Sequence, residues 1–312
     1  MKKFLKTAAI FLMTLFIGVC IGKGGVEAKA AVSQTDAQKT TATVTWTAER
    51  NAVSYNVYLK EYGQEEFVFV ANTPELSYTL TGLKPATKYV VKAAAVKADG
   101  TEEYGSTNYN VVTIPDKMMG FKQERWWYFN KNVNVTWDKQ TGVDGYEVEL
   151  YDNKGKLKKT NKENGYSTST TFPVKNNVVY KARARSFTTF NGNNYYSSWE
   201  TIYCLNQPMI SKVKVSGNKL EVKWKKTNGA TQYKVYVSTK MKTGYKKVAT
   251  VNKSKDSCTV KKFNKKKFSS KKTYYVYVEA ICNKGGTKNT SGSLYCWNTK
   301  RGGGDYSWSH RL

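Results

Sequence analysis

Apolar and polar residues alternate with a period of two along much of the chain, and the strongest alternating stretches occur three times. Three tryptophans, each at the end of a short alternating run, mark the repeats: Trp46, Trp137 and Trp224. Nine residues after each tryptophan, a tyrosine opens a second alternating run: Tyr55, Tyr146 and Tyr233. Side chains of a strand point alternately to its two faces, so these runs predict strands with one buried and one solvated face.

A third alternating run follows later in each repeat. It starts with a tyrosine that lies 43, 43 and 50 residues after the tryptophan: Tyr89, Tyr180 and Tyr274. The seven extra residues of the third repeat fit its lysine-rich stretch. In that run we expect an inward set and an outward set of side chains: Tyr274, Val276, Val278 and Ala280 facing the core, and Tyr275, Tyr277 and Glu279 facing solvent. A register slip of one residue would exchange the two sets.

Short strands, turn residues every 8–12 positions and the lack of a helical period predict an all-β chain of antiparallel sandwiches. Repeats of about 90 residues fit a chain of 312 residues divided into domains of ordinary size. Pro115 and Pro208 lie at the two junctions. We therefore expect three tandem immunoglobulin-like units and a tail: 34–116, 117–208, 209–300 and 301–312.

The first repeat contains a Leu-x-Pro-x-Thr-x-Tyr corner, made of Leu83, Pro85, Thr87 and Tyr89. With the early tryptophan and the Tyr-x-Val run, this corner resembles fibronectin type III domains, and the resemblance covers most of residues 34–300. The later repeats depart from it, with Asn177-Val178 and Lys271-Lys272 at the corner. The resemblance implies interaction or spacer modules without catalytic residues, of the kind found in tandem in bacterial secreted or cell-surface proteins.

The first thirty residues have the pattern of a secretory signal peptide. Three lysines (Lys2, Lys3 and Lys6) precede an apolar run that ends at Ile21, and Ala28-Lys29-Ala30 supplies small residues at a cleavage site. The run is shorter than the ~20 residues that a membrane-spanning helix needs. We expect cleavage after Ala30 and no transmembrane span in the product. The alternatives are an uncleaved anchor and a lipoprotein site at Cys20.

Four cysteines remain after the signal: Cys204, Cys258, Cys282 and Cys296. They allow three complete pairings, and none of their spacings is a Cys-x-x-Cys metal or redox motif. Export makes a disulfide feasible, and Cys282 with Cys296 is the candidate pair. Buried thiols are the alternative, which the fibronectin type III resemblance favours because that domain normally has no disulfide.

The charge is very uneven. The chain has 51 Lys and Arg against 23 Asp and Glu, a net charge of +28. Residues 31–116 have 7 basic and 10 acidic side chains, residues 117–208 have 14 and 8, and residues 209–312 have 25 and 4. The third repeat should therefore attract polyanions.

Because nearly all of this charge is lysine, a hydrated point charge, we expect diffuse and salt-sensitive attraction. Solvated strand lysines without a ligand are the alternative. The candidate binding lysines are Lys225, Lys226, Lys246, Lys247, Lys261, Lys262, Lys265, Lys266, Lys267, Lys271 and Lys272.

Two aromatic features add candidate surfaces. Four consecutive aromatic residues begin with Trp126 and Trp127, and they cannot all face one core from a strand. They indicate either a stacking platform for sugar rings or an inter-domain contact. Further along, the segment that ends at Trp199 resembles the Trp-Ser element of cytokine-receptor type III domains. That resemblance implies a cation–π ladder with the alternating basic residues Lys181, Arg183 and Arg185.

The only histidine, His310, lies near the end of the sequence, so histidine-based triads and zinc sites are not expected inside the repeats. Glu147, Glu149 and Asp152 lie where solvated charge is expected. We therefore predict a non-enzymatic, secreted or envelope-associated adhesion protein without cofactor or metal. Its predicted partner is an anionic polysaccharide or cell-wall polymer, host matrix or another surface protein, and not a specific nucleic acid. The alternatives are a passive spacer and a glycan-active enzyme.

Overall fold

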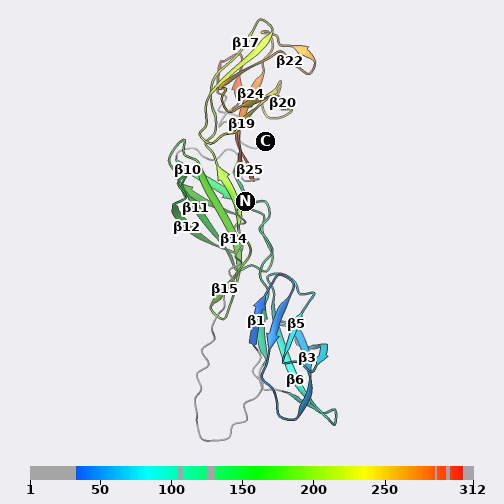
Figure 1. Ribbon diagram of the computed structural model, residues 1–312. Coiled ribbons are helices and arrows are strands. Elements are labelled where there is room, and N and C mark those ends of the chain that lie inside the picture. The colour runs from blue at the N-terminus through cyan, green and yellow to red at the C-terminus, as the bar shows by residue number, and fades with distance from the viewer. Residues whose placement is uncertain (1–32, 105–107, 125–130, 285–286, 293–295, 305–312) are drawn as a thin grey trace, which may run out of the picture.

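A computed structural model describes residues 33–104, 108–124, 131–284, 287–292 and 296–304. In these ranges the chain forms β-strands and no helix, and every strand pairing is antiparallel. Figure 1 shows three pairs of sheets that follow one another along the chain in a row. The predicted fold class, three tandem all-β sandwiches, is therefore confirmed.

The first unit contains a three-stranded sheet made of β1 (Ser33–Ala37), β2 (Ala42–Thr45) and β5 (Ser77–Leu80). The facing sheet has the order β4 (Val68–Thr73), β3 (Ala52–Glu61), β6 (Lys88–Lys97) and β7 (Glu102–Tyr104), and β8 (Tyr109–Val112) also pairs with β6. Strand β4 thus forms the outer edge of the larger sheet.

The second unit repeats this arrangement. Its smaller sheet contains β13 (Ser169–Pro173), β10 (Asn132–Thr136) and β9 (Lys122–Gln123). The larger sheet has the order β12 (Leu157–Asn164), β11 (Gly145–Tyr151), β14 (Tyr180–Phe190) and β15 (Asn193–Tyr196), with β16 (Glu200–Cys204) also paired to β14. Strand β12 is the counterpart of β4.

The third unit has a smaller sheet of β17 (Met209–Ser216), β18 (Lys219–Lys225) and β21 (Ser257–Val260). The larger sheet has the order β20 (Lys246–Asn252), β19 (Gln232–Ser238), β24 (Tyr275–Lys284), β26 (Trp297–Asn298) and β27 (Gly303–Gly304), with β25 (Thr287–Gly292) beside β24. A hairpin of β22 (Lys262–Phe263) and β23 (Lys266–Lys267) lies between β21 and β24 in the sequence.

The spacing of nine residues brings one tryptophan and one tyrosine together in each core. The ring centroids are 5.6 Å apart in the first unit, 5.1 Å in the second and 5.3 Å in the third. Each tyrosine hydroxyl also accepts a backbone N–H from the loop after the tryptophan, from Glu49, Gln140 and Thr227. The pair therefore joins the two sheets and fixes the loop between them.

The second feature that recurs in all three units is a tyrosine corner. In the first unit, the hydroxyl of Tyr89 accepts the N–H of Lys84 at 2.7 Å. Tyr180 and Tyr274 form the same bond, although the segments before them lack the Pro-x-Thr sequence. Their hydroxyls accept the N–H of Lys175 at 3.0 Å and of Ser269 at 3.3 Å. The offset of five residues is the same in all three, so the corner depends on the tyrosine and not on the proline.

The register of β24 agrees with the sequence for the inward residues, which lie in the core of the third unit. The expectation of solvated outward residues is wrong for Tyr277 and Glu279, which are both buried. The segment between β19 and β20 covers this face, because Tyr245 contacts Tyr277 at 5.0 Å. Tyr236 stacks on Tyr277 at 4.6 Å, and Cys296 completes the cluster.

The junction between the second and third units is buried. The side chain of Gln123 accepts the N–H of Leu205 at 2.8 Å and donates to the carbonyl of Leu205 at 2.9 Å. Leu205 itself is fully buried in the core of the third unit. Gly229 lies so close to Val179 that a Cβ on this glycine would be 2.1 Å from the valine Cγ2. Backbone and side chain of the two units are thus packed together.

The junction between the first and second units is held by exposed groups. Lys88 Nζ lies 3.5 Å from Asp144 Oδ2, and Lys39 Nζ lies 3.4 Å from Asp116 Oδ1. One close backbone approach accompanies these ion pairs, since a Cβ on Gly142 would be 2.7 Å from the carbonyl oxygen of Ala86. The two junctions therefore use different interactions.

Candidate binding surfaces

The outer face of the larger sheet in the second unit carries the predicted ladder of cations and aromatic rings. Arg183 and Arg185 both lie over Trp199, at 4.0 and 4.3 Å from its ring centroid. Arg185 also lies 3.5 Å from the ring centroid of Tyr196, and Lys181 lies 4.6 Å from that of Tyr151. Alternation along β14 places all three cations on one face. The ladder with Trp199 is confirmed for Arg183 and Arg185, whereas Lys181 lies over Tyr151 instead.

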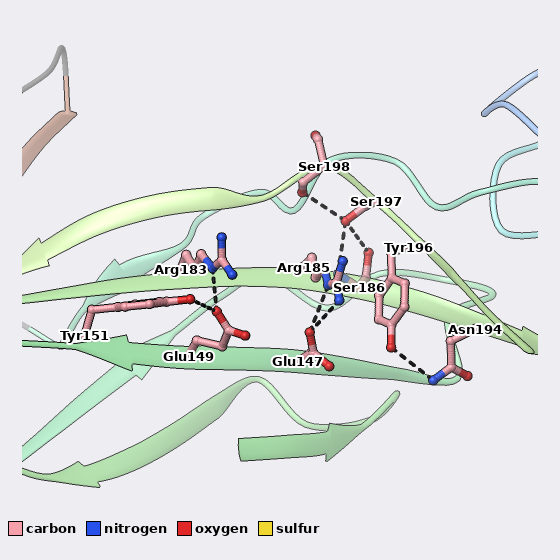
Figure 2. Close-up of polar contacts among 10 residues, drawn as sticks. All are labelled: Glu147, Glu149, Tyr151, Arg183, Arg185, Ser186, Asn194, Tyr196, Ser197 and Ser198. Atoms are coloured by element: carbon pink, nitrogen blue, oxygen red, sulfur yellow. Dashed lines mark hydrogen bonds and ion pairs between the residues drawn. The ribbon is translucent and has the colours of Figure 1, made fainter. Parts of the chain in front are cut away.

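Two acidic side chains of β11, Glu147 and Glu149, lie beside the arginines of this ladder, as Figure 2 shows. Glu147 accepts two hydrogen bonds from Arg185, at 2.7 and 3.0 Å, and Glu149 accepts one from Arg183 at 2.5 Å. The hydroxyl of Tyr151 donates to Glu149 as well. The expectation of solvated carboxylates is therefore wrong for Glu147 and Glu149, because the arginines of the neighbouring strand form ion pairs with them.

The environment of Glu149 favours its charged form. Burial acts to raise the pKa of this carboxyl, but hydrogen bonds from Arg183 and Tyr151 and the charges of Arg183 and Arg185 outweigh it. The pKa of Glu149 consequently lies below its ordinary value. The carboxylate is a fixed structural charge held by two arginines, which is different from a general acid that exchanges protons near neutral pH.

The candidate lysines of the third unit are all exposed, and within the described residues none of them forms an ion pair. Most of them gather at the end of the unit that lies away from the second unit, where Figure 1 places β22. The N–H of Phe268 donates to the carbonyl of Asn218 and so holds the lysine-rich segment against the turn between β17 and β18. This group, called the far-end lysines below, comprises Lys246, Lys247, Lys261, Lys262, Lys265, Lys266, Lys267, Lys271 and Lys272.

Lys225 and Lys226 are not part of that group. They lie at the end of β18, next to the loop in which Asn228 donates to Asn177 of the second unit. Strand β18 separates them from the far-end lysines by its length. The structure thus brings together nine of the eleven candidates and leaves two at the opposite end of the unit.

The acidic residues of the third unit offer the far-end lysines little compensation. Glu221 pairs with Lys212 at 3.1 Å, on the outer face of the smaller sheet. Glu279 is buried, and Asp256 lies in the loop between β20 and β21. The positive field of the far end is therefore not neutralised by carboxylates of the described part of this unit.

The disulfide predicted between Cys282 and Cys296 is absent from the structure, in which both residues are thiols. Alternation along β24 explains this result. Cys282 points into the sandwich core together with Val278, whereas Cys296 packs on Tyr277 at the opposite face of the same strand. Burial raises the pKa of the thiol of Cys204 to about 12 and that of Cys258 to about 11, so these thiols are poor nucleophiles.

Several sequence predictions concern residues that the structure does not describe. Trp126 and Trp127 lie outside the described residues, as do the signal segment and His310. Within the described ranges, no cluster of three or more potential metal ligands is present. Helices long and apolar enough to cross a membrane are likewise absent from the part of the chain that the structure covers.

Residues 29–110 match the family model of the fibronectin type III domain. The first unit is a fibronectin type III domain. The second and third units repeat its strand order, its Trp–Tyr pair and its tyrosine corner, so the chain is a tandem array of this fold. Fibronectin type III domains generally serve as binding or spacer modules of extracellular and surface proteins, and the family is typically non-catalytic.

Among solved structures, the chain is similar to a segment of two fibronectin type III domains from chicken tenascin. The identity is 18%, the match covers 56% of this chain and 98% of that one, and the TM-score is 0.40. It is also similar to the FN1–FN3 domains of chicken CNTN1, with 15% identity, 85% and 97% coverage and a TM-score of 0.29. No curated protein matches the chain.

Proposed function

We propose that the chain is a secreted, non-enzymatic binding protein whose third unit attracts anionic polymers, such as cell-wall polymers or acidic glycans. The observation that carries this proposal is the group of far-end lysines, exposed and without ion pairs in the described structure. Export after cleavage behind Ala30 would place this unit among such polymers. The first two units would then hold it at a distance from whatever binds the other end.

The chemistry of the group indicates how it would bind. Lysine ammonium groups are strongly hydrated point charges and lack the planar fork with which arginine binds single phosphates or carboxylates. A group of them on a turn-rich end therefore attracts a flexible anionic chain by its summed field. Affinity from such a field falls steeply with ionic strength, because the screening length shrinks to about 4 Å at 0.5 M salt.

The test is retention of the mature chain on immobilised heparin, used as a defined anionic polymer, across a sodium chloride gradient. Replacement of Lys261, Lys262, Lys265, Lys266 and Lys267 by glutamine should lower the salt concentration needed for elution. A matched control replaces five exposed lysines of the second unit: Lys154, Lys156, Lys158, Lys159 and Lys162. This control removes the same charge but leaves the far end intact, so its elution should shift much less.

Two results would contradict the proposal: an equal shift for both variants, or binding that persists unchanged at 0.5 M salt. In that event a spacer role becomes the better account, and the buried junction at Leu205 favours it, because it stiffens the array. Retention on purified cell wall and on host matrix, measured in the same salt series, separates the two sources of polymer.

A further inference from the structure

Each unit exposes one strand at the same edge of its larger sheet: β4 in the first unit, β12 in the second and β20 in the third. These strands can be compared position by position, because each pairs with the strand that follows the core tryptophan. We compared the edge residue that lies opposite an inward-facing residue of that strand. In the first unit it is Val68, opposite Leu59. In the other two units it is a lysine: Lys159 opposite Leu150, and Lys246 opposite Val237.

Lysine at this position protects the edge in the last two units. An exposed edge strand presents backbone N–H and C=O groups that can pair with another chain, and lysines on the edge oppose such pairing. Strand β12 contains Lys158, Lys159 and Lys162, and β20 begins with Lys246 and Lys247. Strand β4 has the sequence Val-Phe-Val-Ala-Asn-Thr and carries no charge.

The side chains at the start of β4 are apolar and exposed. Val68 is 66% exposed and Phe69 is 54% exposed. Among the described residues, β4 pairs only with β3, and no other element covers its outer edge. A β-bulge lies at the same edge, but the third unit has one at the equivalent place and carries lysines in addition. The bulge therefore does not replace the missing charges.

Acidic side chains lie at both ends of β4. Glu65 and Glu66 come before the strand and Glu75 follows it, and all three are exposed. At the first end, Glu65 and Glu66 line a hollow of about 610 Å³ beside Val68. Two lysines also line the hollow: Lys84 is paired with Glu61 at 2.5 Å, and Lys60 lies over the ring of Phe67 and donates to the backbone carbonyl of Glu65.

We propose that β4 is a docking edge for an extended segment of a partner protein, which adds to the sheet as a further strand. Main-chain hydrogen bonds supply affinity in this mode of recognition, and the flanking side chains supply specificity. The structure favours a segment with alternating apolar residues, to contact Val68 and Phe69, and with lysines or arginines at its ends, to meet the carboxylates.

The charges also argue against a second copy of this chain as the occupant. Antiparallel pairing of β4 with β4 of another copy would bring Glu65 and Glu66 of one copy next to Glu75 of the other. Parallel pairing would place Glu65 and Glu66 against their own counterparts. Like charges in such positions oppose association, so the complementary occupant is a basic segment of a different protein. This site lies on the first unit and is independent of the polymer binding proposed for the third.

The test measures binding of a fluorescent peptide, KKVTVTVKK, to the full mature chain by anisotropy. Two further peptides serve as controls: EEVTVTVEE reverses the flanking charge, and KKVTPTVKK breaks the strand, because proline lacks the N–H that pairing requires. The first peptide should bind at least about tenfold more tightly than either control. On binding, the backbone amides of β4 should exchange more slowly with deuterium.

A double variant, Val68→Lys with Phe69→Lys, gives β4 the lysine pair with which β20 begins. Both side chains are more than half exposed, so the melting temperature should fall only slightly, through loss of the edge contact between Phe69 and Tyr58, while affinity for KKVTVTVKK falls at least about tenfold. The matched control, Val53→Lys with Met119→Lys, adds the same charge at other exposed apolar positions. It should bind almost as well as the unmodified chain.

The proposal is overturned if the double variant binds as tightly as the control variant, or if β4 amides show no added protection. It is equally overturned if EEVTVTVEE binds as well as KKVTVTVKK. A dimer of the unmodified chain in sedimentation that the double variant abolishes would show that a second copy occupies the edge, which also contradicts it.

Discussion

The two junctions of this chain join units of the same fold by different means. Between the second and third units, Leu205 is buried in the core of the third unit, and the amide of Gln123 satisfies both of its backbone groups. Between the first and second units, the contacts include ion pairs between partly or fully exposed side chains, such as Lys88 with Asp144, and the close approach of Gly142 to the carbonyl of Ala86. The stabilisation from buried apolar surface is not screened by salt, whereas exposed ion pairs are.

The contrast between the junctions indicates that the array bends at the first junction. A linker residue that belongs to the core of the next unit cannot move without opening that core. An exposed ion pair contributes about 0–1 kcal/mol and reforms easily. We therefore expect the second and third units to move as one body, and the first unit to change its angle to them. The proposed polymer-binding end and the proposed docking edge thus lie on opposite sides of the weaker junction.

The largest expected effect is that of Leu205→Ala. Removal of a fully buried leucine leaves a cavity, and such changes cost about 2–5 kcal/mol of unfolding free energy. Urea denaturation followed by tryptophan fluorescence should show this loss in the transition of the third unit. Leu157→Ala, at an exposed position of β12, is the matched control and should stay within about 0.5 kcal/mol. Equal effects of the two variants would contradict a shared core at this junction.

Gln123→Ala comes next, because it leaves the buried N–H and C=O of Leu205 without the amide that now binds them. Each buried polar group without a partner costs about 1–3 kcal/mol. The first junction offers a control in Gln140, whose partly buried amide donates to the carbonyl of Asp116 while its own oxygen has no hydrogen-bond partner among the described residues. Gln140→Ala should cost less than about 1 kcal/mol in the same denaturation experiment. A larger loss for Gln140→Ala would reverse the ranking of the junctions.

Gly142→Ala tests the close approach at the first junction. The backbone of Gly142 has φ = +77°, and a Cβ there would meet the carbonyl oxygen of Ala86. Gly155 has φ = +81° and open space around it, so Gly155→Ala carries the same backbone cost, about 1 kcal/mol, without the clash. Distances between spin labels on the first and second units should widen only for Gly142→Ala. Identical distances in both variants would show that the approach does not hold the junction.

The smallest effect is expected for Lys88→Ala, which removes one partly exposed ion pair worth less than about 1 kcal/mol. The same label distances should broaden slightly, and raising the salt should broaden them in the unmodified chain as well. Lys84→Ala removes an ion pair within the first unit and should leave the distances unchanged. If salt leaves the label distances across the first junction unchanged, as we expect across the second junction, the two junctions do not differ in the proposed way.

What the sequence determined by itself is local in origin. The period of two marks the strands, because side chains of a strand alternate whatever lies around it. The nine residues from tryptophan to tyrosine indicate the same loop three times, and the structure closes each loop on the tyrosine hydroxyl. Alternation along β14 also placed Arg183 and Arg185 on one face, and the resemblance of the Trp199 segment to the Trp-Ser element implied the ring on which they stack.

Other features depend on which distant segment of the chain covers a given face, and these became visible only in the folded structure. Tyr277 alternates like a solvated residue, yet the segment around Tyr245 folds over it. Glu147 was expected in solvent, but Arg185 comes to it from a neighbouring strand. Cys282 points to one face of β24, and Cys296, which comes from outside that strand, packs on the opposite face. Alternation indicates which residues of a strand share a face. Whether that face is buried depends on segments that are distant in the sequence, because burial is a property of the whole folded chain.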